Sequence, residues 1–479
     1  MSIAFTRLFF FGDSITDPGR LPEPFRPDPP YVGGRFTNGL VYSQILPREL
    51  GVSSTNFAFG GADAVSSGPE QLLIGLEAQV IAFKAKYLFS GVPSGSAASI
   101  FIGGNDYHDA DPNDASIVGD VLESIDDAAV RLARDGVKEL VLFNLPATSL
   151  TPRGLSLSAA ERAAEDALIA DHNVGLRKLA ATYNGAGVST TIIDVNRLTR
   201  EVAADQGTYG LKEFYVPLYT LDRNDRPVPT GITSQADPDE VAFFDSIHPT
   251  AAGHGILTAF AEATLRADKV TFGGSKDDVI RGVSTADFVV AGLGDDVTST
   301  SGGNDVVLAG RGDDAVYGGA GSDLAIGGSG KDLLGGSTGS DLLAGGADDD
   351  VLGGGDGNDV LILGTGLDKA RGNAGNDLII VTDDALTGFD RVYGDAGRDT
   401  LRLDVSAEVF ALQAFQDEIH AFVPGDATIL RTVGVTARDV ERLEVYVDDT
   451  RKFATGLAAV DQGAAAKALI HDADLWGFL

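Results

Sequence analysis

A serine and a histidine–aspartate pair are the residues of this chain that could perform nucleophilic catalysis. The 479 residues include no cysteine, which excludes thiolate and disulfide chemistry. Ser14 stands in the segment Phe11–Asp17, FGDSITD, directly after an apolar run that predicts a strand. A serine flanked by glycine at a strand end can present its hydroxyl to a substrate, although it could also cap a helix. The spacing is not Gly-x-Ser-x-Gly, which disfavours the α/β-hydrolase arrangement.

A candidate general base lies close to a carboxylate near residue 245. His248 follows Asp245 by three residues in the segment DSIHPT, so one loop could place the carboxylate on the imidazole. An Asp-x-x-His spacing alone is weak, because it commonly marks a surface turn. Of the other five histidines, only His108 follows a predicted turn after a strand, and it could border the same site.

Aspartate recurs every nine residues in the second half of the chain. Twelve aspartates keep this interval from Asp278 to Asp377, and it resumes at Asp390 after one failure. Residues 271–399 contain 23 Asp, no Glu and 8 Lys or Arg, so a short carboxylate is needed at fixed backbone positions. Most of these aspartates have a glycine two residues before and an apolar residue two residues after. Glycine permits turns with positive φ, and carboxylate and carbonyl oxygens are the ligands that calcium prefers.

This nonapeptide, Gly-Gly-x-Gly-x-Asp-x-U-x, resembles the calcium-binding repeat of RTX proteins. The resemblance implies an all-β parallel β-roll in which two repeats form one coil and stacked coils share calcium. Each repeat would contribute a three-residue strand whose middle side chain points inward. A flexible Gly/Asp linker is the alternative, but it does not account for twelve aspartates in phase. The predicted metal-binding residues are Asp296, Asp305, Asp314, Asp323, Asp332, Asp341, Asp350, Asp359, Asp368 and Asp377.

Four segments within residues 5–267 resemble, in order, the sequence blocks of the GDSL lipase/esterase family, also called SGNH hydrolases. One departure is Ile15-Thr16, where Leu-Ser is more common. Asp13 and Asp17 are expected to accept hydrogen bonds that structure the first block. The four segments are Phe11–Asp17, Asn56–Ala62, Gly103–Asp106 and Asp245–Pro249.

The resemblance implies a role for each of several residues. Ser14 would be the nucleophile, His248 the general base, and Asp245 the group that orients His248. The oxyanion hole would combine the Ser14 N–H, the Asn105 side-chain amide and the N–H of Gly61, chosen over the glycine before it. Catalysis of this kind needs no cofactor, so calcium is expected only as a structural ion.

Strands alternate with helices up to about residue 270, which predicts a parallel sheet covered on both faces. The family resemblance specifies this as an α/β three-layer, flavodoxin-like domain, with catalytic loops at the carboxyl ends of the strands. The predicted strands are Arg7–Phe11, Thr55–Ala58, Ser99–Gly103, Glu139–Phe143 and Ser189–Asp194. The predicted helices are Ser116–Ala133, Ser158–Ala180 and Ala251–Leu265, of which the second opens with a capping-box spacing.

Composition limits the partners and suggests three domains. A net charge of −34 disfavours nucleic acid and anionic membrane surfaces as partners. No apolar stretch of about 20 residues predicts a transmembrane segment, and the N-terminus lacks the pattern of a cleaved signal peptide. We expect a hydrolase domain over 1–268, a β-roll over 269–400, and over 401–479 a cap with a C-terminal type I secretion signal. Within the last part, Val440–Tyr446 predicts a strand and Ala464–Ile470 a helix.

Together these patterns predict a secreted, extracellular carboxylic ester hydrolase whose partners are an ester or lipid substrate, calcium and type I secretion machinery. One alternative is a phospholipase, lysophospholipase or acyltransferase with the same triad, and another is a non-catalytic calcium-dependent surface protein. We expect a preference for short to medium acyl chains. Phe214, Tyr215, Tyr219 and Leu221 either line the acyl site or pack in the core.

Overall fold

The computed structural model describes residues 3–21, 27, 30–65, 71–111, 114–207, 209, 211–221, 227–230, 240–382, 389–447 and 450–456. The chain divides into two compact units that separate between Leu265 and Arg266. Among the described helices, none has the length and apolar character needed to span a bilayer.

The N-terminal unit is built on a five-stranded parallel sheet of order β2-β1-β3-β4-β5, which confirms the predicted α/β class. This is the flavodoxin-like order, in which the chain reverses direction across the sheet between β1 and β3. Side chains of β3 are buried on both faces, as expected for a sheet covered by two helical layers. The strands are β1 Arg7–Gly12, β2 Ser53–Asn56, β3 Ser96–Phe101, β4 Glu139–Phe143 and β5 Ser189–Ile193.

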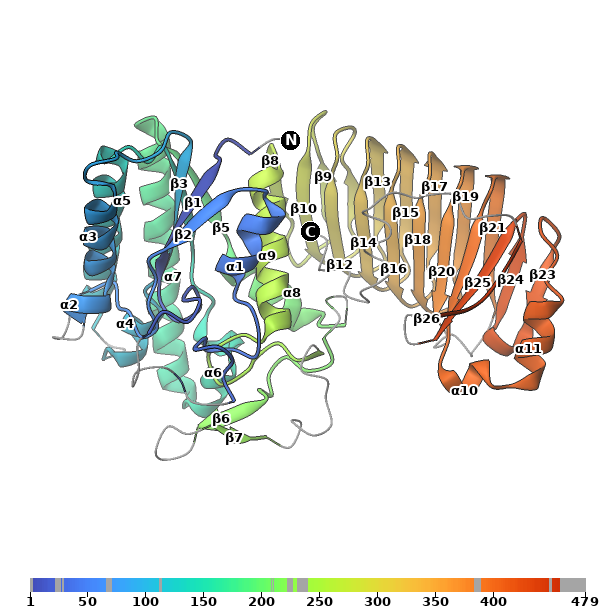
Figure 1. Cartoon of the computed structure of the whole chain (residues 1–479), viewed down its shortest axis with the longest axis horizontal. Helices are drawn as coiled ribbons and strands as arrows, with labels where there is room; N and C mark the ends of the chain where they lie inside the picture. Colours follow the sequence, from blue (N-terminus) through green and yellow to red (C-terminus); the bar gives the residue numbers. More distant parts are fainter. Residues whose placement is uncertain are drawn as a thin grey trace. The chain divides into compact units, whose positions relative to one another are not determined.

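Helices cover both faces of this sheet (Figure 1). Helices α3, α5 and α7 pack side by side on one face, and α1, α8 and α9 lie toward the other. Ser158 caps α7 in the predicted capping box with Glu161. The helices are α1 Tyr42–Glu49, α2 Gln71–Ile74, α3 Leu76–Tyr87, α4 Gly104–Asp109, α5 Ser116–Arg134, α6 Pro152–Ser156, α7 Ala159–Gly185, α8 Val195–Ala204 and α9 Ala251–Arg266. A 3₁₀ turn, η1 Thr148–Leu150, and a hairpin of β6 Tyr219–Leu221 and β7 Pro227–Pro229 complete the unit.

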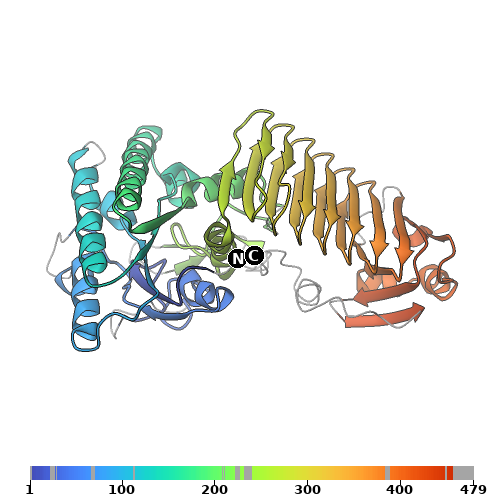
Figure 2. The same ribbon diagram turned by 90° about the horizontal axis from the view of Figure 1, so that it is seen from above.

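The C-terminal unit is a parallel β-roll, as the repeat predicts, with successive strands alternating between two sheets (Figure 2). Val289 pairs with Val307, so one coil is eighteen residues and contains two repeats. One sheet includes β8 Lys269–Phe272, β10 Asp287–Leu293, β12 Val306–Arg311, β14 Leu324–Ser329, β16 Leu342–Ala347, β18 Val360–Thr365, β20 Leu378–Thr382 and β22 Thr400–Asp404. The other includes β9 Val279–Arg281, β11 Val297–Ser299, β13 Ala315–Ala320, β15 Leu333–Thr338, β17 Val351–Asp356, β19 Lys369–Gly375 and β21 Asp390–Gly397.

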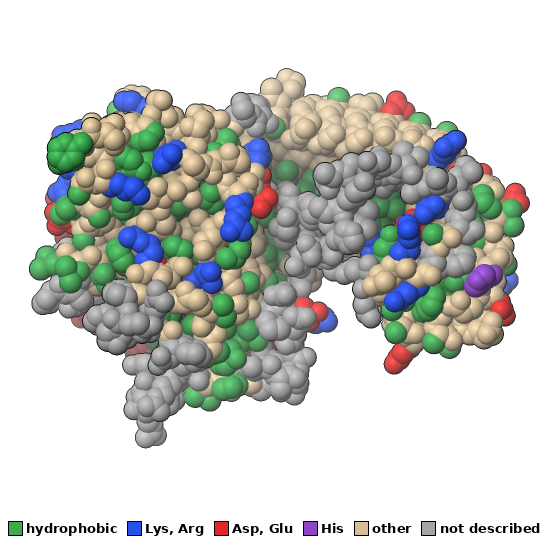
Figure 3. All heavy atoms as spheres, in the orientation of Figure 1, with side chains coloured by type: hydrophobic (Ala, Val, Ile, Leu, Met, Phe, Trp, Pro, Cys, Tyr) green, Lys and Arg blue, Asp and Glu red, His purple; other side chains and the backbone are tan. Residues whose placement is uncertain are grey.

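The residue two positions after each aspartate points into the roll, as expected. Val289, Leu343 and Leu361 are fully buried in one continuous core. Most strands are six residues long rather than the three expected, because the glycines that follow the apolar residue stay paired with the next coil. Where the roll is not drawn in grey, its surface in Figure 3 is mostly tan, the colour of backbone and of side chains that are neither hydrophobic nor charged.

Turn geometry explains the glycines between the strands. Gly312 has φ of 135°, and a Cβ there would overlap the carbonyl oxygen of Gly294 in the preceding coil. Asp348 replaces glycine at the equivalent position of its repeat and adopts a left-handed φ of 77°. The turns therefore require a positive φ even where the residue is not glycine.

A mixed segment closes the far end of the roll. Strands β24 and β25 extend the two sheets in parallel, and β23 and β26 then pair antiparallel with them. Phe415 and Ile419 of α11 are fully buried against the core of the roll. The elements are α10 Ala407–Phe410, α11 Gln413–His420, β23 Thr428–Leu430, η4 Arg431–Val433, β24 Val435–Arg438, β25 Arg442–Val447 and β26 Thr450–Gly456. The predicted helix Ala464–Ile470 and the predicted secretion signal lie outside the described residues.

Candidate active site

Three predicted side chains from distant parts of the sequence form one hydrogen-bonded chain. The Oγ of Ser14 lies 2.8 Å from Nε2 of His248. The other ring nitrogen, Nδ1, lies 2.7 Å from Oδ2 of Asp245. All three are largely buried, with 7% of Ser14 and 14% of the His248 side chain exposed. This geometry allows the imidazole to take a proton from the hydroxyl while the carboxylate stabilises the resulting charge.

Local backbone structure holds both ends of this chain. Ser14 follows β1 in a turn in which the carbonyl of Asp13 accepts hydrogen bonds from two N–H groups. In the second loop, Oδ1 of Asp245 accepts the N–H groups of Ile247 at 2.8 Å and His248 at 2.9 Å. One oxygen of Asp245 therefore shapes the loop, and the other holds the histidine ring.

Burial and charge act in opposite directions on the two titrating partners. Burial alone would lower the pKa of His248, but the carboxylate of Asp245 outweighs it, and the pKa lies above its ordinary value. Burial alone would raise the pKa of Asp245, but the charge and hydrogen bonds of His248 hold it below the usual range. The pair therefore favours the state in which the imidazole is protonated and the carboxylate is ionised.

Asp13 and Asp17 make the loop hydrogen bonds expected of them. Oδ1 of Asp13 accepts the N–H of Ile15 at 3.1 Å, and burial raises the pKa of Asp13 to about 7. Asp17 accepts the N–H groups of Gly19 and Arg20 through one oxygen. Among the described residues, neither carboxylate hydrogen-bonds to the Ser14 hydroxyl or to the His248 ring, although the Asp13 carboxylate adds to the effect of Asp245 in raising the pKa of His248.

The candidate oxyanion groups lie after β1, β2 and β3, at the reversal point of the sheet. The N–H of Gly60 donates to Oδ2 of Asp17 at 2.9 Å, so this glycine is already engaged. Gly61 is exposed with φ of 73°, and a Cβ there would meet nothing within 4 Å. The Asn105 side-chain amide donates one hydrogen to the carbonyl of Ala62 at 2.9 Å, and its second N–H can still serve as a donor. The geometry favours Gly61 over Gly60 as an oxyanion donor.

Two aromatic residues complete the surroundings of the triad and were missed from sequence. The Tyr31 hydroxyl donates to Oδ2 of Asp245 at 2.7 Å, and the Phe36 ring stacks on His248 with centroids 5.0 Å apart. Tyr31 also packs on Phe244, which precedes Asp245. No sequence pattern pointed to Tyr31, which lies 214 positions before Asp245. Phe36 belongs to the segment Arg35–Gly39, which resembles the lipase-like branch of the GDSL family, but the sequence assigned it no role.

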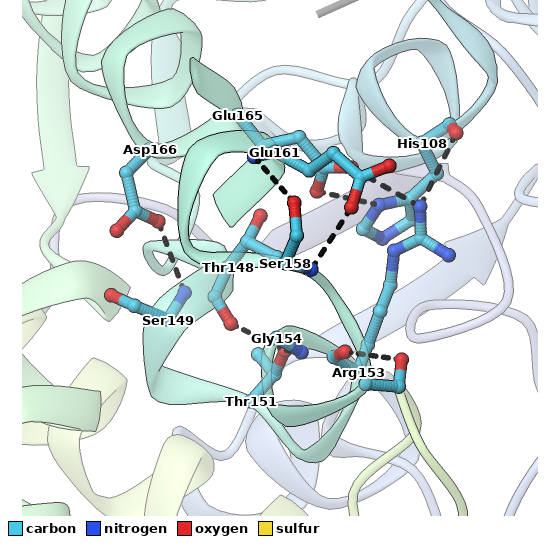
Figure 4. Close-up of polar contacts among 11 residues, drawn as sticks. His108, Thr148, Ser149, Thr151, Arg153, Gly154, Ser158, Glu161, Glu165 and Asp166 are labelled. Carbon is cyan, nitrogen blue, oxygen red and sulfur yellow. Dashed lines mark hydrogen bonds and ion pairs between the residues drawn. The ribbon is translucent and has the colours of Figure 1, made fainter. Parts of the chain in front are cut away.

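His108 lies one turn after Asn105 in α4, in a polar cluster with Arg153 and Glu165 (Figure 4). Nη2 of Arg153 lies 3.3 Å from the His108 carbonyl oxygen and 3.3 Å from Oε1 of Glu165. The backbone N–H of Arg153 donates to the carbonyl of Ser246, inside the histidine loop, at 2.9 Å. Burial, followed by Arg153, lowers the pKa of His108 to about 4, so its ring is neutral. The cluster thus ties α4 and α7 to the loop of His248.

The four residues expected near an acyl chain have different surroundings. Phe214 is 3% exposed and lines an apolar cavity. Tyr215 packs against Phe214, whereas Tyr219 packs on Phe244 in a separate small core. The side chain of Leu221 lies outside the described residues.

The repeat aspartates form two ladders of buried carboxylates along the roll. The N–H of Asp296 donates to Oδ1 of Asp314 in the next coil at 2.7 Å, and this pattern repeats along both ladders. The ladders continue across the longer interval, since the N–H of Asp368 donates to Oδ1 of Asp390 at 2.9 Å. Asp332 accepts in the same way as its neighbours. Oδ2 is buried with no hydrogen-bond partner among the described residues in Asp296, Asp305, Asp314, Asp323, Asp341, Asp350, Asp359, Asp368 and Asp377.

These oxygens fit the ligand requirements of calcium. A Cβ on Gly336 would overlap Oδ2 of Asp341 and approach the carbonyl oxygen of Gly354, so two hard oxygens face one glycine. Within the described part of the chain, no three Asp, Glu or His side chains converge as a metal cluster. A cation in the ladders would therefore need backbone carbonyls besides carboxylates. Burial raises the pKa of Asp350 to about 8 and that of Asp323 to about 7, as expected for carboxylates lacking a counter-charge.

Comparison with known proteins gives two family matches. The model of the GDSL-like lipase/acylhydrolase family matches residues 8–259. The RTX calcium-binding nonapeptide repeat matches 272–298, 299–334, 326–361, 335–370, 353–385 and 384–404.

Several curated bacterial proteins are similar to the N-terminal part. A phosphatidylcholine-sterol acyltransferase of Aeromonas hydrophila is 32% identical over 44% of this chain and 64% of its own length. The secreted effector protein SseJ of Salmonella typhimurium is 34% identical over 36% of this chain and 42% of its own. A thermolabile hemolysin of Vibrio parahaemolyticus is 23% identical over 51% of this chain and 60% of its own. The chain spans less than two thirds of each of these relatives.

Proposed function

The chain belongs to the GDSL-like lipase/acylhydrolase family, and from this we propose that it is a carboxylic ester hydrolase working through an acyl-enzyme on Ser14. The observation that carries the proposal is the hydrogen-bonded series from Ser14 through His248 to Asp245. A serine hydroxyl becomes a competent nucleophile when a positioned base removes its proton during attack.

The proposed reaction has two acyl transfers. Oγ of Ser14 bonds to the ester carbonyl carbon as its proton moves to Nε2 of His248. The bond from the carbonyl carbon to the leaving oxygen then breaks, and His248 returns the proton to the departing alcohol. Water attacks the acyl-serine with His248 again as base, which releases the acid and restores Ser14. Asp245 stabilises the imidazolium in both steps.

The carbonyl oxygen becomes negative in each tetrahedral intermediate and needs fixed donors. We assign these to the N–H groups of Ser14 and Gly61 and to the side-chain amide of Asn105. The engagement of the Gly60 N–H by Asp17 supports the choice of Gly61. Catalysis by these groups requires no cofactor.

Transfer of the acyl group to another alcohol is the second candidate activity. The similarity to an acyltransferase of Aeromonas hydrophila favours it, because an acyl-enzyme can be attacked by an alcohol as well as by water. Product analysis with a phospholipid donor, with and without a sterol acceptor, separates hydrolysis, phospholipase activity and transfer. Steryl ester in the acceptor reaction identifies a transferase.

The roll is proposed to bind calcium through Asp296 to Asp377 and to fold after export. Buried carboxylate oxygens without a hydrogen-bond partner in the described part of the chain, such as Oδ2 of Asp323 and of Asp350, support this, because they destabilise the roll until a cation neutralises them. Submicromolar calcium would leave such sites empty, whereas millimolar calcium would fill sites with Kd of about 10⁻⁴–10⁻³ M. We therefore propose an extracellular protein exported by type I machinery. Retention inside cells that carry an active type I exporter would contradict this.

The proposed chemistry is tested by covalent labelling and by loss of turnover. An alkyl phosphonate should form an adduct on Ser14, identified by peptide mass analysis. Ser14→Ala and His248→Ala should each lose most of kcat and keep a small residual rate from binding and the oxyanion donors. Asp245→Asn should also reduce kcat. Full activity of purified Ser14→Ala protein would exclude the proposed nucleophile.

A further inference from the structure

An apolar cavity extends beneath the catalytic loops of the N-terminal unit. It lies between α8 and α9, which contribute Leu198 and Leu257 to its wall, and Phe214 closes another side. Two of its lining residues, Ile15 and Ile247, are the direct chain neighbours of Ser14 and His248. Ser14 and His248 do not line the cavity themselves, but the two loops that carry them contribute Ile15 and Ile247 to its wall.

The lining is apolar throughout apart from two threonines. Seventeen described residues line the cavity, none of them is charged, and Thr151 and Thr199 contribute the only side-chain hydroxyls. Thr199 already donates its hydroxyl to the Val195 carbonyl at 2.7 Å. A polar or ionised ligand would lose its hydration here without replacement hydrogen bonds, so the cavity suits an alkyl group.

We propose that this cavity binds the acyl chain of the ester and sets its preferred length. The inference rests on the proposed acyl-enzyme mechanism, which brings the acyl carbon within bonding distance of Ser14. In this proposal the chain attached to that carbon passes Ile15 or Ile247, which belong to the loops of Ser14 and His248, to enter the cavity. Burial of each methylene removes apolar surface from water and raises kcat/KM by about fourfold as long as the chain remains inside.

The size of the cavity limits the chain. Its volume is about 90 Å³, and one water-sized group needs roughly 10–15 Å³ of such space. The cavity therefore accommodates about six to nine such groups. We expect kcat/KM to rise from acetyl esters to an optimum between about hexanoyl and nonanoyl and then to level or fall. This is the preference for short to medium chains expected from sequence, now assigned to a particular set of residues.

Substitutions at neighbouring positions of α8 test the assignment. Thr199 is half-buried and lines the cavity, whereas Arg200 is exposed on the same helix and does not. Thr199→Leu fills part of the cavity and should lower the hexanoate-to-acetate ratio of kcat/KM by about fourfold or more, because one or more methylenes are displaced. Thr199→Ala enlarges the cavity and should shift the optimum to longer chains. Arg200→Leu is the matched control and should keep the wild-type profile.

The measurement is kcat/KM for soluble 4-nitrophenyl esters from acetyl to decanoyl, using full-length protein with calcium. Opposite shifts of the chain-length profile in Thr199→Leu and Thr199→Ala support the proposal. Profiles of both variants that coincide with Arg200→Leu, while hydrolysis still depends on Ser14, overturn the acyl cavity and leave the mechanism intact. Absence of Ser14-dependent hydrolysis for every ester instead overturns the proposed function. If Thr199→Leu does not fold, the profile of Thr199→Ala alone decides.

Discussion

Replacing one repeat aspartate by asparagine should have opposite effects with and without calcium. Asp323 accepts the N–H of Asp305 through Oδ1, and an asparagine can keep this hydrogen bond. Its Oδ2 is buried without a partner among the described residues, and burial raises its pKa from 3.8 to about 7. Asp323→Asn therefore removes an uncompensated charge from the calcium-free roll and a candidate ligand from the calcium-bound one.

The sign and size follow from proton linkage. The pKa of Asp323 is higher in the folded state than in the unfolded state, so the protonated carboxyl group stabilises the fold. This stabilisation is fully present below about pH 4 and is lost as the pH rises through about 7. Each pKa unit corresponds to about 1.4 kcal/mol. Since the carboxylate is only partly shielded from solvent, we expect a discounted gain of ~1–2 kcal/mol for the calcium-free variant at pH 8. That corresponds to about 2–8 °C in Tm for a unit of this size.

Thermal unfolding followed by circular dichroism at pH 8 measures both effects. In chelator the roll of Asp323→Asn should retain more β-structure than that of the wild type and lose it at higher temperature, and in millimolar calcium it should melt at lower temperature. Asp349→Asn is the control, because Asp349 is partly exposed and paired with Lys331, which lowers its pKa. This control should not gain stability in chelator. A lower Tm of calcium-free Asp323→Asn, or equal shifts with and without calcium, would refute the electrostatic account of the ladder.

Further changes test the candidate active site. Tyr31→Phe removes a hydrogen bond to Asp245 and should lower kcat about tenfold with little change in KM; an unchanged kcat in steady-state assays would remove Tyr31 from the site. Asn105→Ala should lower kcat by about 10²–10³ if its amide stabilises the oxyanion, and a smaller loss would point to another donor. Arg153→Ala should reduce kcat more than KM, and Arg153→Lys should restore part of it; equal kinetics of the two variants would argue against a positioning role. The value of kcat/KM should rise with pH as His248 loses its proton, and the midpoint of this rise should lie above pH 6.5. Asp245→Asn should move the rise to lower pH, because the Asp245 carboxylate raises the pKa of His248.

The fold could be predicted where a local pattern repeats or where a strand is wholly apolar. Strand β4 has the bounds expected from sequence, Glu139–Phe143, because its burial on both faces produces an uninterrupted apolar run. Helix α8 was not predicted as a helix: it is short, and its apolar residues face a cavity rather than a sheet. Strand β2 lies two residues earlier than expected, since its exposed serines give no apolar signal.

The candidate site was predictable where its residues belong to compact motifs. Asp245 and His248 lie in one short segment, and the loop hydrogen bonds between them are set by that spacing. Tyr31 and Arg153 reach the same loop from distant segments, and only the tertiary fold brings them there. The engagement of the Gly60 N–H likewise depends on a carboxylate 43 residues earlier in the chain.

The eighteen-residue coil limits how the length of the roll can change. Insertion or deletion of eighteen residues adds or removes one complete coil and leaves every later strand in its own sheet. A change of nine residues keeps aspartate next to aspartate but moves every later strand to the opposite sheet, and with it the closing strands β25 and β26. Internal duplication should therefore lengthen this roll in steps of two repeats. One coil is longer than eighteen residues, because 22 residues separate Asp368 from Asp390. The hydrogen-bonded ladder of aspartates nevertheless continues across this longer coil.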